Sequence, residues 1–173
     1  MNLSNFYDLS YSDLSDFISS NFSLEKKKTS MRTNQIWKFV YKKGLKETSK
    51  FSNISSELKD NMEKSFNFNR TNIAEKKISK DGTIKWLLKL SDNNLVETVF
   101  IPSGKRGTLC VSSQVGCTLN CKFCHTGTQL MVKNLTTHEI INQILVAKDE
   151  LNDWGSQKKI TNIVYMGMGE PFY

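Results

Sequence analysis

The sequence lacks a long apolar run, an export signal and scattered cysteines. No stretch approaches the ~20 apolar residues that a membrane-spanning helix needs, so no membrane partner is expected. Residues 1–8 contain neither a basic start nor an apolar segment, and therefore predict no secretory signal. The chain has four cysteines, three of them bunched, which does not fit a disulfide framework and indicates metal binding in a reducing compartment. We therefore expect a cytoplasmic protein.

The positive charge is concentrated in the middle of the sequence. Of the net charge of +7, residues 1–25 contribute no Lys or Arg and four acidic residues. Residues 26–90 hold 17 Lys and Arg against 6 acidic residues, and residues 91–173 hold 7 of each. A regional basic excess can bind a phosphate backbone, although a solvated lysine-rich surface explains it equally well.

Apolar periodicity predicts helices in the first third of the 173-residue chain. Residues 4–25 fit one or two short amphipathic helices, and residues 53–68 fit a helix with apolar positions four apart. Between them, Ile36, Phe39 and Val40 share one helical face in residues 31–45, and Gly44 is a stop signal.

The second half predicts strands around one helix. Residues 83–90 and 95–101 flank a short polar turn and indicate a β-hairpin. Residues 108–112 fit the next strand, Thr136 and Glu139 fit the capping box of a helix, and residues 160–166 fit a buried parallel strand. This order is a βαβ unit, which places ligand sites at the carboxyl ends of its strands.

Three cysteines in eight residues, Cys117, Cys121 and Cys124, form a C-x3-C-x2-C loop after the first of these parallel strands. Three thiolates on a four-iron cluster leave one iron open to a substrate or cofactor. Zinc with His125 as a fourth ligand is an alternative, but His125 directly follows Cys124, which strains the loop. A c-type haem is a second alternative, because residues 121–125 fit C-x-x-C-H, but it leaves Cys117 unexplained.

The second parallel strand ends in Gly167-Met168-Gly169-Glu170-Pro171. Two glycines after a strand are often only a tight turn. One βαβ unit downstream of a cysteine loop, they predict a backbone that approaches a ligand closely, with the Glu170 carboxylate suited to an ammonium group.

With this turn, the cysteine loop resembles radical S-adenosylmethionine (SAM) enzymes. The longer stretches 109–127 and 162–171, with 32–44, 81–86 and 96–102, resemble the RlmN/Cfr branch, whose RlmN members are dual-specificity 23S rRNA and tRNA adenine-C2 methyltransferases. The resemblance covers nearly the whole chain. It implies a radical SAM RNA methyltransferase that uses a [4Fe-4S] cluster and two SAM molecules per turnover.

The resemblance also implies roles for individual residues. Cys117, Cys121 and Cys124 would ligate the [4Fe-4S] cluster, and Gly169 and Glu170 would hold the methionyl ammonium group of SAM. Glu97 falls where the family has the base that takes a proton from the substituted adenine carbon. Cys110 falls where the family has a thiol that forms a transient disulfide with a methyl-carrying cysteine. From pattern alone, a surface carboxylate and a small buried residue are the simpler interpretations of these two.

The expected fold class is α+β followed by α/β. Residues 1–90 would form a small, mostly helical, basic accessory domain with a β-hairpin that binds RNA. Residues 91–173 would begin an incomplete radical SAM partial TIM-type barrel. The family implies 23S rRNA, tRNA and a reducing electron donor such as flavodoxin as partners.

Family members are considerably longer than this chain, and the family's methyl-carrying cysteine is expected beyond Tyr173. We therefore expect a fragment, such as half of a split gene, a frameshifted remnant or a shortened product, that is not competent alone. A second chain supplying the remaining half is a further expected partner. The alternatives are an RNA-binding remnant without catalysis and a plain iron–sulfur or zinc module.

Overall fold

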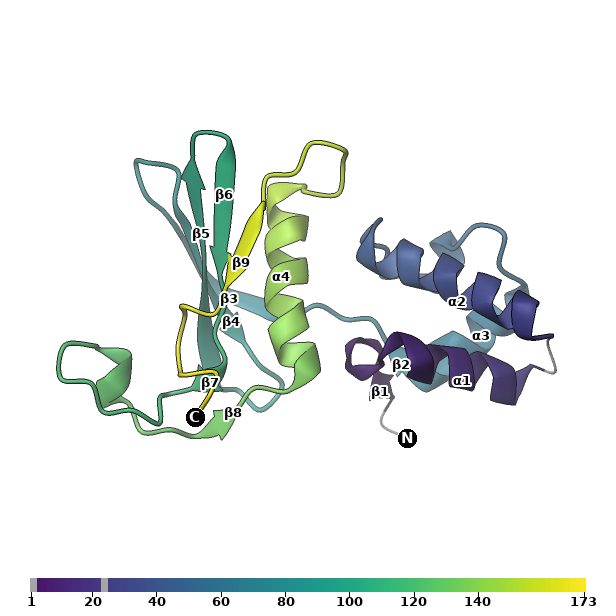
Figure 1. Ribbon diagram of the computed structural model, residues 1–173, viewed down its shortest axis with the longest axis horizontal. Coiled ribbons are helices and arrows are strands. Elements are labelled where there is room, and N and C mark those ends of the chain that lie inside the picture. The colour runs from purple at the N-terminus through teal and green to yellow at the C-terminus, as the bar shows by residue number, and fades with distance from the viewer. Residues whose placement is uncertain (1–2, 23–24) are drawn as a thin grey trace. The chain divides into compact units, whose positions relative to one another are not determined.

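The computed structural model describes residues 3–22 and 25–173 (Figure 1). Residues 23 and 24, which belong to the helical stretch predicted over 4–25, lie outside the described residues. The chain divides into two compact units, residues 1–69 and 70–173. This division falls before the predicted boundary at residue 90, because the strands that precede residue 90 pair within the second unit.

The first unit is mostly helical, as the periodicity predicts. Its elements are β1 (Ser4–Asn5), η1 (Phe6–Asp8), α1 (Tyr11–Asn21), α2 (Lys26–Tyr41), η2 (Thr48–Lys50), α3 (Ser56–Ser65) and β2 (Phe66–Asn67). The two short strands pair in parallel. Helix α1 begins with a capping box, in which the Ser10 backbone N–H donates to Asp13 at 2.8 Å and the Asp13 N–H donates to Ser10 Oγ at 3.1 Å. Helix α2 ends at Tyr41, and Gly44 follows at a φ of +68° with its N–H donating to the Val40 carbonyl, which confirms it as a stop signal.

Aromatic side chains fill the core of the first unit. Phe6 stacks on Phe68 with ring centroids 4.6 Å apart, and Phe39 stacks on Phe51 at 5.2 Å. The Tyr7 hydroxyl is buried and donates to the Phe68 carbonyl at 2.9 Å. These contacts pack the start of the chain against the residues just after α3, so both ends of the unit share one core.

A five-stranded mixed sheet forms the second unit. Its strands are β3 (Asn72–Ile78), β4 (Ile84–Lys89), β5 (Leu95–Ser103), β6 (Arg106–Cys110) and β9 (Asn162–Val164), in the order β3-β4-β5-β6-β9. The first three pairs are antiparallel, and β6 pairs with β9 in parallel. The predicted hairpin is thus confirmed as β4 and β5, whereas β3 was not predicted. All seven residues of β3 are exposed, so it lacks the alternation that marks a strand.

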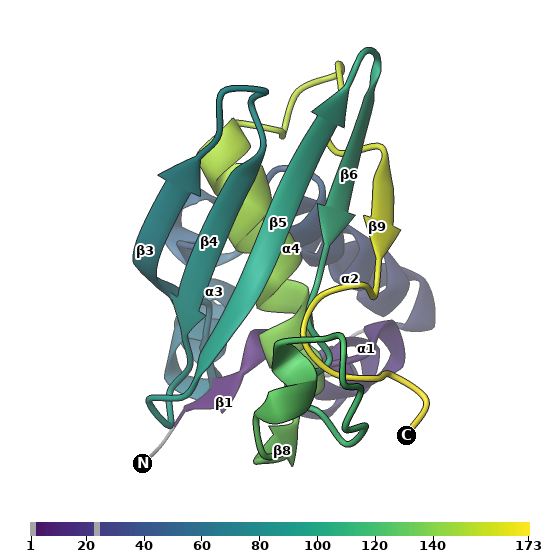
Figure 2. The same ribbon diagram turned by 90° about the vertical axis from the view of Figure 1, so that its left-hand side faces the viewer.

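Helix α4 (Thr137–Leu151) connects β6 to β9 and covers one face of the sheet (Figure 2). Two short strands, β7 (Gln114–Val115) and β8 (Lys133–Asn134), and the 3-10 helix η3 (Thr126–Thr128) lie between β6 and α4. Trp86, Val96 and Leu109 of the sheet belong to one buried core with Val146 and Ala147 of α4. The predicted βαβ unit is therefore confirmed, including the capping box at Thr136 and Glu139.

The second parallel strand differs from its prediction as a buried strand. Strand β9 has three residues, lies at the edge of the sheet, and leaves the Ile163 side chain 46% exposed. Apolar composition predicted burial on both faces, but β9 pairs with β6 on one side only. Among the described residues, no helix combines the length and the apolar character that crossing a membrane requires.

Candidate cofactor site

The cysteine loop and the glycine turn lie at the same edge of the sheet. The loop follows β6 and the glycine turn follows β9, and these two strands run in the same direction (Figure 2). Backbone hydrogen bonds join the two segments: Gly167 N–H donates to the Val111 carbonyl at 3.1 Å, and Ser113 N–H donates to the Met168 carbonyl at 2.9 Å. The predicted meeting of the two motifs at the carboxyl ends of the strands is therefore present.

The loop cysteines are partly exposed and unpaired. Each of the four cysteines, all within the described ranges, has a free thiol. Within the loop, Cys124 N–H donates to the Cys121 carbonyl at 3.1 Å, and the Cys117 sulfur accepts from Leu119 N–H at 3.4 Å. The donor chemistry suits iron or zinc, since free and accessible thiols are available on one short loop. In residues 3–22 and 25–173, however, no three Cys, His, Asp or Glu side chains lie close enough together to hold a metal ion.

Glu97 and Cys110 lie on the sheet face opposite α4. Val96 and Thr98 are buried on the α4 side of β5, so the alternation of the strand turns Glu97 and Val99 to the other face. Cys110 pairs with Val99 and lies on that face too, because its neighbour Leu109 is in the core. The structure thus brings the two predicted catalytic residues onto one face of adjacent strands.

The surroundings of these two side chains differ. The Glu97 carboxylate accepts from Lys85 Nζ at 2.8 Å, and both side chains are close to half exposed. Burial raises the pKa of the Cys110 thiol, which keeps it protonated at neutral pH. Glu97 therefore has the accessibility that a base needs, whereas Cys110 is not activated by its surroundings in this conformation.

A buried glutamine on α4, which sequence reasoning missed, holds the start of the cysteine loop. Gln143 is fully buried and accepts from the Ser112 backbone N–H at 2.7 Å, while its amide donates to the Ser112 carbonyl at 2.9 Å. Thr98 also donates to Gln143, at 2.9 Å. The one available signal was a polar residue among the apolar positions of α4, and that pattern does not identify its partner.

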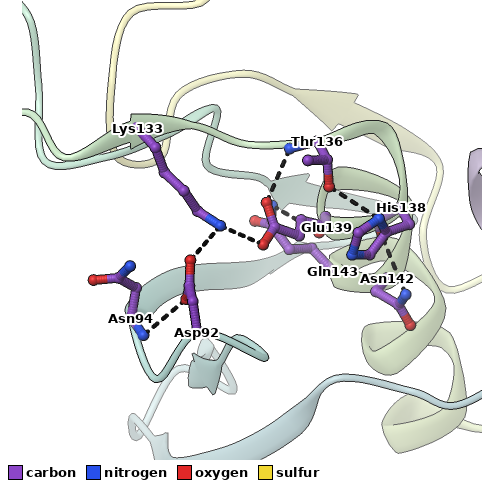
Figure 3. A network of polar contacts seen from close by, with 8 residues as sticks. All are labelled: Asp92, Asn94, Lys133, Thr136, His138, Glu139, Asn142 and Gln143. Atoms are coloured by element: carbon purple, nitrogen blue, oxygen red, sulfur yellow. Dashed lines mark hydrogen bonds and ion pairs between the residues drawn. The ribbon is translucent and has the colours of Figure 1, made fainter. Parts of the chain in front are cut away.

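An ion-paired lysine holds the end of the loop (Figure 3). Lys133 Nζ lies between the carboxylates of Asp92, in the β4–β5 turn, and Glu139, at 2.7 Å in the first turn of α4. Glu139 also accepts from the Thr136 backbone N–H at 2.9 Å. Burial lowers the pKa of Lys133, but its bonds to both carboxylates outweigh that effect and raise the pKa overall. The hydrogen bond from Lys133 lowers the pKa of Asp92 to about 2.

A pocket of about 370 Å³ opens beside the glycine turn, lined by residues that include Ser113, Asn134, Ile140 and Glu170. Gly169 has a φ of +89°, and a Cβ there would lie 2.4 Å from Gln114 Cβ. The backbone of the turn therefore packs directly on the residue that begins β7. Glu170, the next residue, lines the pocket.

The curated relatives compared with this chain share one name. Relatives named dual-specificity RNA methyltransferase RlmN include one from Rhodopseudomonas palustris (strain BisB5), 49% identical over 155 residues that cover 83% of this chain and 39% of the relative. The relative from Rhizorhabdus wittichii is 46% identical, with coverage of 87% and 38%, and that from Chelativorans sp. (strain BNC1) is 46% identical, with coverage of 89% and 42%. No protein-family model matches the chain.

A solved structure also resembles the chain. It is the crystal structure of a radical SAM methyltransferase from Sphaerobacter thermophilus, with a TM-score of 0.82 and 29% identity. The match covers 98% of this chain and 48% of that protein. The chain thus spans about two fifths of the curated relatives and about half of the solved one.

Proposed function

The chain resembles RlmN dual-specificity RNA methyltransferases in sequence and a radical SAM methyltransferase in fold, and from this premise we propose that it is the N-terminal part of a radical SAM RNA methyltransferase. The observation that carries this proposal is 46–49% identity over more than four fifths of the chain. The βαβ unit with its cysteine loop would then begin a partial TIM-type barrel, and its parallel pairing of β6 with β9 supports this part of the proposal.

Cys117, Cys121 and Cys124 would hold a [4Fe-4S] cluster. When bound, such a cluster supplies the electron that cleaves SAM. The free, partly exposed thiols of the loop support this assignment, because they are available as ligands without breaking a disulfide. A reducing electron donor such as flavodoxin would deliver the electron.

Gly169 and Glu170 would bind the methionyl ammonium group of SAM. The support is geometric: the turn is hydrogen-bonded to the strand that leads into the cysteine loop, and Glu170 lines a pocket there. A carboxylate at that position pairs with an ammonium group.

Glu97 would accept the proton from the adenine carbon, and Cys110 would form the transient disulfide with a methyl-carrying cysteine. Their common sheet face, opposite α4, supports a shared reaction space. Lys85 must then release the Glu97 carboxylate, or move with it, when substrate binds.

The chain's other three cysteines are assigned to the cluster, so the methyl-carrying cysteine is not among its 173 residues. Tested by themselves, these residues are therefore expected to bind the cluster without completing methylation, and a second chain with the remaining length would restore it.

RNA, as 23S rRNA and tRNA, would contact the basic residues of the region 1–90. Lys26, Lys27 and Lys28 are exposed at the start of α2, where they can reach phosphates. Residues 70–90 of the second unit add Arg70 and five lysines against two acidic residues. Basic residues therefore occur in both compact units.

Anaerobic reconstitution with iron and sulfide tests the proposal. We expect a cluster that, after reduction by one electron, gives an electron paramagnetic resonance signal that shifts when SAM is added. Alanine at Cys117, Cys121 or Cys124 should abolish the cluster, whereas Cys110→Ala should retain it. If the alanine variants keep the cluster, or if RNA binding is the only property found, the proposed function is wrong.

A further inference from the structure

Gln114, the first residue of β7, is a buried polar side chain at the centre of the candidate site. It is 1% exposed and lies in the short strand β7, three residues before Cys117. Burying an amide costs free energy unless its donors and acceptor are hydrogen-bonded. Each of its polar atoms has partners, and these partners belong to different segments of the chain.

The side-chain oxygen of Gln114 connects the cysteine loop to the glycine turn. Gln114 Oε1 accepts from the Glu170 backbone N–H at 3.1 Å and from the Thr118 backbone N–H at 3.3 Å. Thr118 directly follows Cys117. One oxygen atom is thus bonded to the residue beside the first loop cysteine and to the residue expected to hold the SAM ammonium group.

The amide nitrogen fixes the orientation of that oxygen. Gln114 Nε2 donates to Asn134 Oδ1 at 2.9 Å and to the Tyr173 carbonyl at 3.0 Å. Asn134 pairs with Gln114 across the β7–β8 ladder, so this side of the amide is held by the end of the cysteine loop. Gly169 packs so closely on Gln114 that a methyl group on Gly169 would lie 2.4 Å from Gln114 Cβ.

We propose that Gln114 is a positioning residue that holds the Glu170 backbone and the cysteine loop in one fixed geometry for SAM. This inference rests on the proposed function and adds to it a residue with no ligand contact of its own. Loss of the amide should free the two segments from each other and weaken SAM binding, while the three thiols remain available to the cluster.

The test compares Gln114→Met, which keeps the side-chain length but removes every side-chain hydrogen bond, with Gln129→Met. Gln129 is exposed in the same loop and is the matched control. Two measurements are made on the reconstituted chain: amide hydrogen exchange of the peptides that contain Thr118 and Glu170, and the SAM concentration that half-saturates the spectral shift of the cluster.

We expect Gln114→Met to keep the wild-type iron and sulfide content. Its Thr118 and Glu170 amides should exchange at least tenfold faster, and it should require roughly tenfold more SAM, in line with the loss of one or two net hydrogen bonds. Gln129→Met should behave as wild type. Gln114→Glu keeps an acceptor toward Thr118 and Glu170 but places its second carboxyl oxygen against two acceptors, Asn134 Oδ1 and the Tyr173 carbonyl, so its SAM response should be weakened as well.

Wild-type exchange and SAM response in Gln114→Met would overturn the proposal. So would a parallel loss of melting temperature, cluster content and SAM response in both Gln114 variants, because Gln114 would then serve folding alone. A wild-type chain whose cluster does not respond to SAM contradicts the proposed function instead. In that case, exchange that still depends on Gln114 would support the connection between the two segments.

Discussion

At the scale of single residues, the site contains positions where a small change of the side chain alters the stability of the fold. Gly169 combines a positive φ with a direct contact on Gln114, and Asp92 is held as a carboxylate by Lys133. Both effects are local, and both can be measured by a single substitution with a matched control.

Gly169→Ala should destabilise the fold. A non-glycine residue at positive φ costs about 1–2 kcal/mol, and a methyl group forced against Gln114 costs about 1–3 kcal/mol more. The free energy of unfolding from urea titration measures the loss. Gly155→Ala is the control, because no atom lies within 4 Å of its Cβ position. Equal stabilities of the two variants would contradict the described packing of the turn.

Asp92→Asn should destabilise the fold in a pH-dependent way. The folded-state pKa of Asp92 is about 2 against an ordinary 3.8, so the carboxylate stabilises the folded state above about pH 4. That contribution is lost as the pH falls toward 2. The stability difference between wild type and variant should therefore be larger at pH 6 than at pH 2. Because the Asp92 side chain is 36% exposed, added salt should reduce the difference at pH 6. A difference independent of pH would show that the ion pair with Lys133 is absent in solution.

At the scale of elements, helix α4 holds both ends of the cysteine loop. Gln143 binds the backbone of Ser112 at the start of the loop, and Glu139 reaches Lys133 at its end. These two helix residues are four apart and therefore lie on one side of α4. The helix that buries the sheet thus also fixes the loop that is expected to carry the cofactor.

Gln143→Met should cost about 1–3 kcal/mol of stability, because the buried Ser112 N–H loses its partner. Thermal unfolding detects the change, and Gln157→Met, at an exposed position, is the control. An unchanged melting temperature in Gln143→Met would mean that Ser112 finds another acceptor, and that α4 does not hold the start of the loop through this residue.

Much of the fold was predictable where local signals are strong. The turn between β4 and β5, the capping box of α4 and Gly44 at the end of α2 each follow from residues close in sequence. Strand β3 and the edge position of β9 were not predictable, because pairing with a neighbour decides them rather than composition. The two buried glutamines, Gln114 and Gln143, were missed for the same reason. Gln114 accepts from the Glu170 N–H and Gln143 accepts from the Ser112 N–H, and both partners are far away in the sequence. The cysteine and glycine motifs were found because their spacing is itself the signal.

At the scale of the whole molecule, the basic charge is shared between two compact units. The middle segment 26–90 carries the excess, but the unit boundary lies inside it, between Asn69 and Arg70. The sequence could not indicate this division. The charge distribution is read along the chain, whereas the unit boundary is set by the pairing of β3 with β4 and of β4 with β5. RNA binding is therefore expected to involve basic residues from both units.

Replacing Lys26 and Lys27 by alanine should weaken RNA binding and reduce its salt dependence, because fewer counterions are released. Fluorescence anisotropy with a tRNA at several salt concentrations measures both quantities. Lys105 and Lys158 are exposed in the second unit outside the basic segment, and their double alanine variant is the control. Equal losses in the two variants would indicate nonspecific charge attraction instead of a defined basic surface.

The most direct test of the central claim is the iron, sulfide and zinc content of the chain purified without air. The account predicts about four iron and four sulfide per chain, lost when Cys121 is replaced by alanine. One zinc per chain with no sulfide would contradict it.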